Sequence, residues 1–441
     1  MLEAYRASIL HFLRDPLDTA SAGGWEHFQD GLLVLDSGRV KALGPASALL
    51  HLLPRSVRVH EARGKWILPG FVDCHVHFPQ LDVVASYGER LLEWLNRYVY
   101  PVERRFKDEA YARRAARFFL AELLRHGTTT ALVFGTVHPE SVETFFEEAY
   151  RLRLRMVAGK ALMDRNVPKF LRDTPQSSYR DCARLIKRWH GRGRLSYAVT
   201  PRFAPTSSES QLRAAGRLLS EMPGVHLHTH LAENSREIRW VRGLFPWAKD
   251  YLGVYERFGL VGERSLFAHA IHLSESERRR LASSGSAVAF CPSSNLFLGS
   301  GLFDFEGMVS RGINLGIGSD IGAGTSLSIL ENLSEAYKIA QLKGQNMSPF
   351  QAFYLATLGG AKAMRLDHVI GNFLPGKEAD FVMLDPRDPP LLAYRMKQAG
   401  TLEETLFLFM MLGDDRVVDS TYVLGRLVYA RKERDVQRTV R

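Results

Sequence analysis

The sequence predicts an α/β protein: a (β/α)8 TIM-type barrel with a small β-sandwich domain that the N- and C-terminal segments form together. Three observations lead to this prediction. Between about residues 72 and 320, short apolar runs alternate with long helical patterns, which is typical of parallel βα units. Eight such runs can be counted, and eight strands close a barrel. Further strand-like segments lie outside this region, near both ends of the chain.

The expected barrel strands are short and rich in apolar or β-branched residues, as strands buried on both faces should be. In chain order they are Val72–His77, Thr129–Phe134, Met156–Ala161, Leu195–Thr200, Val225–His230, Leu266–Ala270, Ala287–Cys291 and Asn314–Gly318. Helical patterns lie between them, for example at Glu103–Arg125 and Ser207–Glu221. No glycine-rich phosphate fingerprint follows the first strand, so the barrel is favoured over an open doubly wound sheet.

The flanking segments carry strand patterns of their own. These patterns fall at Leu32–Leu43, where an Asp-Ser-Gly turn separates two strands, and at Val57–His60, Ala379–Leu384 and Ser420–Tyr429. A helical segment, Pro349–Met364, precedes the last two. We therefore expect residues 1–68 and 371–441 to form one composite β-sandwich domain, and residues 69–370 to form the barrel.

Composition narrows the class of protein. The chain has 441 residues, of which 46% are hydrophobic and 24% charged, so a large core can form. The net charge is +10, but the basic residues are mixed with acidic ones, which predicts a solvated surface and no nucleic-acid partner. Cys74, Cys182 and Cys291 are odd in number and far apart, which favours a reducing compartment. No run approaches the ~20 apolar residues of a membrane span. We expect a cytoplasmic protein with no membrane partner.

Polar side chains gather where the expected strands end, which is where barrel active sites lie. His75 and His77 end the first strand two residues apart, so both imidazoles face the same side. His230 ends the fifth strand, whereas His226 and His228 on the same face are expected to pack inside the barrel with hydrogen-bond partners. The eighth strand leads into Asp320. His75, His77, His230 and Asp320 together offer donors suited to zinc, with a position left for water.

Two further residues could act on that water. Glu233 lies three residues after His230, near enough to serve as a proton shuttle, although it could instead be a first-turn helix carboxylate stabilised by the helix dipole. His269 ends the sixth strand and could be a further ligand or could hold the water by a hydrogen bond. The second role is favoured. A bound divalent ion brings the pKa of its water towards about 7, which indicates hydrolytic chemistry.

Longer strings carry a family resemblance. Ile67–His77, His230 with Glu233, His269 and Ser319-Asp320 together resemble the amidohydrolase superfamily, whose members are metal-dependent barrels with a β-sandwich built from both termini. A narrower resemblance, to the guanine deaminase family, extends in order over nearly the whole chain. It is carried by Leu91–Leu95, Gly127–Thr130, Thr200–Phe203, His230–Asn234, Cys291–Leu296, Ala356–Gly360 and Leu412–Arg416.

The resemblance implies a function and a set of roles. It implies one Zn2+ per chain on His75, His77, His230 and Asp320, and hydrolytic deamination of guanine to xanthine and ammonia in purine catabolism. Gln80, Arg202 and Phe203 would hold the purine beside Glu233 and Asp320. Asp320 would take a proton from the water that attacks C2, Glu233 would deliver protons to the ring and the departing amine, and His269 would stabilise developing charge. Trp94 would belong to a lid, and the chain would form a homodimer.

Several alternatives stay open at this point. Ser293, His272 and the segment Gly318–Gly324 depart from the family pattern, so the substrate could be another aminated heterocycle: 8-oxoguanine, another purine, a pyrimidine or a triazine. Lys160 could be carbamylated between two metals, although an ion-paired lysine is the simpler interpretation. The Pro-Cys-x-x-Cys motif of the small zinc deaminases is absent. A scaffold without a metal is disfavoured by the complete ligand set.

Overall fold

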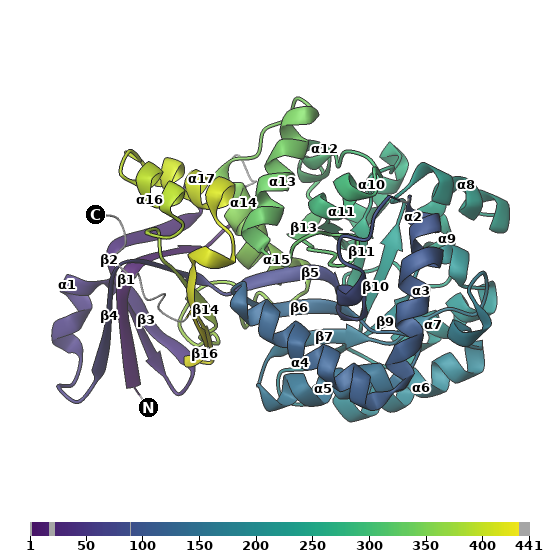
Figure 1. Cartoon of the computed structure of the whole chain (residues 1–441), viewed down its shortest axis with the longest axis horizontal. Coiled ribbons are helices and arrows are strands. Elements are labelled where there is room, and N and C mark those ends of the chain that lie inside the picture. The colour runs from purple at the N-terminus through teal and green to yellow at the C-terminus, as the bar shows by residue number, and fades with distance from the viewer. Residues whose placement is uncertain (1, 17–22, 89, 432–441) are drawn as a thin grey trace, which may run out of the picture.

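A computed structural model describes residues 2–16, 23–88 and 90–431 and contains two sheets (Figure 1). The barrel strands are β5 (Phe71–His77), β6 (Thr128–Phe134), β7 (Arg155–Gly159), β8 (Ala161–Leu162), β9 (Ser196–Pro201), β10 (His226–Leu231), β11 (Ser265–His269), β12 (Ala287–Phe290) and β13 (Asn314–Ile317). Their ladders are parallel, in the order β13-β12-β11-β10-β9-β7-β6-β5, and β8 pairs with β9. The ring closes where the Asp320 N–H donates to the carbonyl of His75 at 2.8 Å.

The predicted barrel is confirmed, and seven of its eight strands begin and end within one residue of the expected bounds. The third strand differs, because the expected run Met156–Ala161 is interrupted at Lys160. Its first part pairs with β6 and β9, whereas Ala161 and Leu162 pair with the end of β9. The break in the ladder at this point turns the Lys160 side chain towards Asp173, with which it forms an ion pair.

Helices surround the barrel between the strands (Figure 1). They are α4 (Glu109–Arg125), α5 (Pro139–Arg151), α6 (Pro175–Trp189), α7 (Glu209–Glu221), α8 (Ser235–Leu244), α9 (Tyr251–Arg257), α10 (Glu275–Ser284), α11 (Pro292–Phe297), α12 (Phe305–Val309) and α13 (Ile329–Leu342). Short helical turns complete the loops: η2 (Phe78–Val83), η5 (Lys169–Leu171) and η6 (Ala204–Thr206). Helix α7 begins two residues later than predicted, because the Ser208 side chain accepts the Gln211 N–H and so caps it.

The helix expected over Glu103–Arg125 is present from Glu109 onwards as α4, but its first six residues belong to other elements. The chain forms α2 (Leu91–Trp94), η3 (Leu95–Val99), α3 (Tyr100–Glu103) and η4 (Arg104–Lys107) in succession, and then stops at Asp108. Asp108 has extended backbone angles, and its side chain accepts the Tyr111 N–H, so it starts α4 as a new helix. The helical segment 91–107 is therefore a separate unit before the first long barrel helix.

The two ends of the chain build the second sheet together. Its strands are β1 (Leu2–Phe12), β2 (Trp25–Asp36), β3 (Arg39–Pro45), β4 (Arg58–Pro69), β14 (Phe381–Leu384), β15 (Val418–Val423) and β16 (Arg426–Ala430). They form one hydrogen-bonded order, β16-β15-β14-β4-β1-β2-β3. The expected turn at residues 36–38 is confirmed, with Ser37 and Gly38 at positive φ. The strand expected at Val57–His60 is the start of the longer β4, which leads directly towards the barrel.

The remaining elements cover the junction between the sheets. They are α1 (Ala46–Leu49), η1 (Leu50–Leu52), α14 (Pro349–Tyr354), η7 (Leu355–Gly359), α15 (Gly360–Ala363), α16 (Pro390–Met396), α17 (Leu402–Leu412) and η8 (Asp415–Val417). The helix expected over Pro349–Met364 is present as α14, η7 and α15, with a π-helical turn in its middle. In Figure 1, α16 and α17 lie over the terminal sheet, next to α14.

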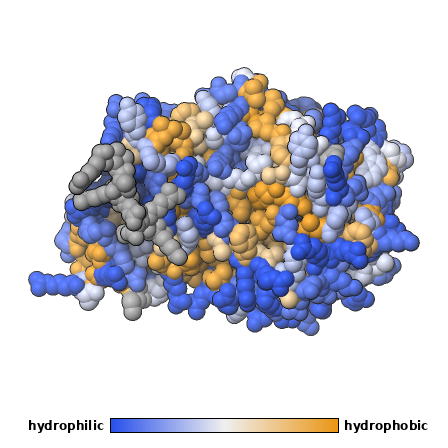
Figure 2. Space-filling model, in the orientation of Figure 1, coloured by the Kyte–Doolittle hydropathy of each residue, from blue (hydrophilic) through white to orange (hydrophobic). Residues whose placement is uncertain are grey.

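The surface and core follow the composition. Figure 2 shows a mostly hydrophilic face on which apolar side chains gather in a few patches. All three cysteines are buried and free. Across the described ranges, no helix combines the length and apolar character needed to cross a membrane.

A buried ionic cluster joins the barrel to the segment before β14, and it yields a stability prediction. Glu378 accepts hydrogen bonds from Arg155 at 2.7 Å and from Arg194 at 2.9 Å, and these three side chains are at most 12% exposed. Glu378→Gln leaves the two cations without this charge, so we expect the free energy of unfolding to fall by about 3 kcal/mol. Urea unfolding measures it. Glu61→Gln, at a half-exposed ion pair with Arg63, is the control. An equal, small loss in both variants would contradict the prediction.

Candidate active site

Four predicted metal ligands converge at the carboxyl-terminal ends of the barrel strands. His75 and His77 come from β5, His230 comes from β10, and Asp320 follows β13. His77 Nε2 lies 3.2 Å from Nε2 of His75 and 3.2 Å from Nε2 of His230. Asp320 Oδ1 lies 3.2 Å from His75 Nε2 and 3.4 Å from His77 Nε2. All four ligand atoms lie within 4.8 Å of one another, which the sequence spacing alone did not require.

The chemistry of this donor set fits a divalent metal ion. Zinc takes ligand atoms at about 2.0–2.1 Å, which places tetrahedral ligands about 3.4 Å apart, close to the observed separations. The Nδ1 of His230 donates to the Arg202 carbonyl oxygen at 2.7 Å, which leaves its Nε2 with a free lone pair. Burial lowers the pKa of all three imidazoles well below the usual value, so they are neutral donors.

The backbone around the ligands is strained in a way common at functional sites. His269 has a φ of 69° and Asp320 a φ of 47°, and neither residue is a glycine. Asp73 supports this geometry, because its carboxylate accepts the backbone N–H of His75 at 3.2 Å and that of Ser319 at 3.0 Å. The buried Asp73 carboxylate thus connects the two chain segments that carry His75 and Asp320, at the place where the barrel closes.

A pocket opens beside the ligands, and every residue predicted to bind substrate or act in catalysis lines it. Its lining comprises His77, Gln80, Leu91, Trp94, Leu95, Arg202, Phe203, His230, Glu233, His269, Leu298, Asp320 and Ala323. Polar groups therefore occupy the side near the ligands, and apolar side chains from the segment 91–107 and two loops complete the wall. This mixture suits a flat, polar heterocycle.

Glu233 faces the pocket and lies outside the adjacent helix. Helix α8 begins at Ser235 after the Asn234 cap, so the alternative in which Glu233 belongs to the first helical turn is wrong. Its Oε1 accepts a hydrogen bond from Ser300 Oγ at 3.1 Å. Burial and the negative charge of Asp320 raise the pKa of Glu233 to about 8, and burial raises the pKa of Asp320 to about 6. A cation at the ligand atoms would lower both pKa values again.

His269 is placed to hydrogen-bond within the pocket. Its Nδ1 lies 2.9 Å from Oδ1 of Asn295, and its Nε2 lies 3.5 Å from Glu233 Oε2 and 3.7 Å from Asp320 Oδ2. That Nε2 is buried, with no hydrogen-bond partner among the described residues. The four-ligand group does not include His269, which belongs instead to a second possible metal-binding group with His75 and Cys291. The geometry therefore leaves both roles open for His269, a hydrogen bond or direct ligation.

The three residues expected to hold a purine all line the pocket. Arg202 follows β9 and donates from Nη1 to Glu103 Oε1 at 2.7 Å. Phe203 is buried, with its ring edge-on to Trp240. Gln80 belongs to η2 and lies against Gly322, where a Cβ would clash with the Gln80 side chain. Gly322 has a φ of 119°, so glycine is required there for both conformation and space.

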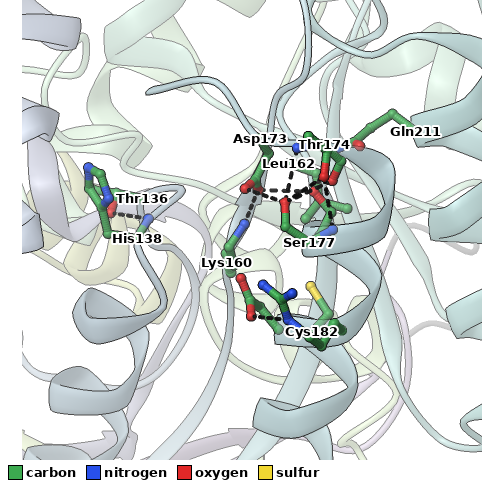
Figure 3. A network of polar contacts seen from close by, with 12 residues as sticks. Thr136, His138, Lys160, Leu162, Asp173, Thr174, Ser177, Cys182 and Gln211 are labelled. Carbon is green, nitrogen blue, oxygen red and sulfur yellow. Dashed lines mark hydrogen bonds and ion pairs between the residues drawn. The ribbon is translucent and has the colours of Figure 1, made fainter. Parts of the chain in front are cut away.

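Lys160 belongs to a network of polar contacts in which its side chain points towards Asp173, as Figure 3 shows. Its side chain is fully buried and paired with Asp173, whose carboxylate also accepts from Ser177 at 3.1 Å and from Ser178 at 3.0 Å. Lys160 is not among the residues that line the pocket. The structure thus agrees with the simpler interpretation, an ion-paired lysine, and not with a lysine that bridges metals.

The structure also shows the contacts of two other residues that depart from the family pattern. Ser293 Oγ lies 2.8 Å from Thr325 Oγ1, and His272 Nε2 donates to the Ser300 carbonyl oxygen at 2.7 Å. His228 is buried as expected, and its Nε2 lies 2.6 Å from His75 Nδ1. Its Nδ1 has no hydrogen-bond partner among the described residues. The expectation that hydrogen bonds would satisfy both ring nitrogens of His228 was therefore wrong. His226 is buried in the barrel.

Several residues around the site were missed from the sequence. Asp73 shares a strand face with His75 and His77, and this period of two was a usable signal. Glu103 carried no signal, because it reaches Arg202 across 99 residues of chain. Ser300 lies in the loop after the seventh strand, on the face where barrel active sites lie, but its contact with Glu233 spans 67 residues.

Comparisons with known proteins agree with the fold. The amidohydrolase family model matches residues 66–428. The guanine deaminase of Escherichia coli (strain K12) is 52% identical over 433 residues, 98% of each chain. A solved E. coli guanine deaminase has a TM-score of 0.95, with 51% identity over 97% of this chain and 100% of the other. The C. acetobutylicum guanine deaminase, solved with guanine bound in its active site, has a TM-score of 0.88 and 27% identity over 97% and 100%. The chain belongs to the amidohydrolase family and groups there with the guanine deaminases.

Proposed function

We propose that this chain catalyses the hydrolytic deamination of guanine to xanthine and ammonia, with one zinc ion per chain. The observation that carries the proposal is one pocket that combines a four-ligand metal site, the buried acid Glu233 and the buried cation Arg202. The E. coli relative that matches 98% of this chain, a guanine deaminase, supports the substrate. So does the C. acetobutylicum structure, which holds guanine in its active site.

The pocket residues can bind and orient guanine. Guanine presents a carbonyl oxygen, which can accept N–H groups of Arg202, and ring nitrogens, which can pair with the Gln80 amide. Phe203 offers an aromatic face or edge for the ring to pack on. Leu91, Trp94 and Leu95 keep the other side of the pocket apolar and exclude water. Together these contacts would present C2 and its amine to the polar side.

His75, His77, His230 and Asp320 would hold the zinc ion, which when bound lowers the pKa of a water molecule towards neutrality. The protein groups then move protons. Asp320 would take a proton from the attacking water, and Glu233 would pass protons to the ring nitrogen and to the amine. The new C2–O bond replaces the C2–N bond, so ammonia leaves and xanthine remains. His269, whose Nδ1 donates to Asn295, would hold the oxygen by a hydrogen bond at Nε2 and so support it as charge develops.

A coupled ammonia-release assay tests the proposal directly. Guanine is supplied to protein whose zinc content has been measured, with adenine, cytosine and 8-oxoguanine as comparison substrates. We expect ammonia from guanine and about one zinc per chain. Metal-loaded protein that is inert towards guanine would overturn the substrate assignment, and turnover of another heterocycle would replace it. Protein that binds no metal would overturn the mechanism.

The assembly and location belong to the same proposal. We infer a cytoplasmic homodimer, since the family resemblance implies a dimer and the three buried, free thiols suit a reducing compartment. Sedimentation of the purified protein measures the dimer.

A further inference from the structure

A buried ion pair borders the substrate pocket, and one of its two partners lies outside the lining. Arg202 lines the pocket, and Glu103 contacts it from outside, with 2.7 Å between Nη1 and Oε1. The two side chains are 4% and 1% exposed. A charge-assisted hydrogen bond of this length between buried groups is strong and directional. Arg202 is therefore held before any substrate enters.

Glu103 belongs to the segment that forms the apolar wall of the pocket. Within the segment 91–107, Leu91, Trp94 and Leu95 line the pocket. Glu103 is the last residue of α3 in the same segment. One turn before Glu103, the ring of Tyr100 lies 5.7 Å from Cζ of Arg202, where it contacts the guanidinium. The wall and the counter-charge of Arg202 thus come from one run of helical turns.

The pairing leaves other donors of Arg202 available. A guanidinium has five N–H groups in one plane, and Glu103 is the one side chain of the described residues that is hydrogen-bonded to it. The second oxygen of Glu103, Oε2, is buried without a hydrogen-bond partner among the described residues, so Arg202 is the one hydrogen-bond partner of this carboxylate there. The remaining N–H groups of Arg202 can serve an acceptor in the pocket.

Glu103 also competes with the two catalytic carboxylates, Asp320 and Glu233, for the positive charge of Arg202. Arg202 interacts electrostatically with Asp320 and Glu233 as well as with Glu103. Without Glu103, the cation would be drawn towards those carboxylates, because a buried charge seeks the nearest opposite charge. Glu103 therefore sets both the direction and the position of the guanidinium.

We propose that Glu103 is a positioning residue for substrate recognition, which fixes the guanidinium of Arg202 so that its free N–H groups face the carbonyl oxygen of the purine. The inference rests on the proposed function, because the purine supplies that acceptor. It makes the segment 91–107 part of the recognition of the carbonyl, in addition to forming the pocket wall.

Steady-state kinetics of Glu103→Gln with guanine test this role. Gln keeps the shape and removes the charge, so we expect KM to rise about tenfold or more while kcat changes far less. Glu103→Asp keeps the charge on a shorter side chain and should recover part of the KM. The matched control is Glu93→Gln in the same segment, where the exposed Glu93 pairs with Arg236 at 2.8 Å, and its KM should equal that of the wild type.

A double-variant comparison separates positioning from a general structural effect. In an Arg202→Met background, Glu103→Gln should cause no further rise in KM, because the group that it positions is gone. Circular dichroism and zinc content verify that each variant is folded and loaded. An unchanged KM in folded Glu103→Gln, or an equal loss in both backgrounds, would overturn the inference. If Glu103→Gln does not fold, an unchanged KM in Glu103→Asp would overturn it. Wild-type protein inert towards guanine would instead overturn the proposed function.

Discussion

Glu233→Gln retains its zinc and loses guanine turnover by about a thousandfold. Burial and the charge of Asp320 raise the pKa of Glu233 to about 8, so without a cation in the site its side chain is protonated and neutral at pH 7. Gln has the same shape and the same lack of charge, and it can still accept the Ser300 hydrogen bond that Oε1 accepts at 3.1 Å. What Gln cannot do is give up and take back a proton. The loss should therefore appear in kcat.

The measurement is a pre-steady-state and steady-state ammonia assay on protein with quantified zinc. Glu221→Gln is the control, since Glu221 pairs with Arg217 on the surface of the barrel. Ser300→Ala removes the hydrogen bond but keeps the carboxyl group, so its loss should be smaller than that of Glu233→Gln. A kcat near that of the wild type in zinc-loaded Glu233→Gln would eliminate the proton-shuttle role.

Removal of the metal abolishes turnover. Chelation should bring ammonia release to background, and added Zn2+ should restore it, because no described side chain can replace the ion as activator of water. His77→Ala takes away the ligand whose Nε2 lies 3.2 Å from both His75 and His230. We expect this variant to bind zinc at least about 100-fold more weakly, since loss even of an outer partner costs 10–100-fold.

Competition with a chromogenic zinc chelator gives the affinity separately from activity. His51→Ala, at an exposed histidine away from the site, controls for adventitious binding to surface imidazoles. Full activity after exhaustive chelation, or wild-type zinc affinity in His77→Ala, would contradict the four-ligand assignment.

Local sequence patterns predicted the barrel and the group of four side chains that could hold a metal ion. Buried parallel strands are short apolar runs, and a barrel places their carboxyl ends on one face, so His75, His77, His230 and Asp320 could be grouped from their positions in the sequence. The same logic placed Glu233 near them. The turn at residues 36–38 was predicted from its Asp-Ser-Gly sequence between two strand patterns. These features depend on spacing of a few residues, which a sequence displays directly.

Only the tertiary structure decided which distant polar groups meet. Lys160, at the break in the barrel ladder, forms its ion pair with Asp173. Glu103 reaches Arg202 across 99 residues. Each of these outcomes depends on competition among burial, counter-charges and hydrogen-bond partners brought together by packing. A local pattern constrains the backbone nearby, whereas a buried charge takes the partner that the completed fold presents to it.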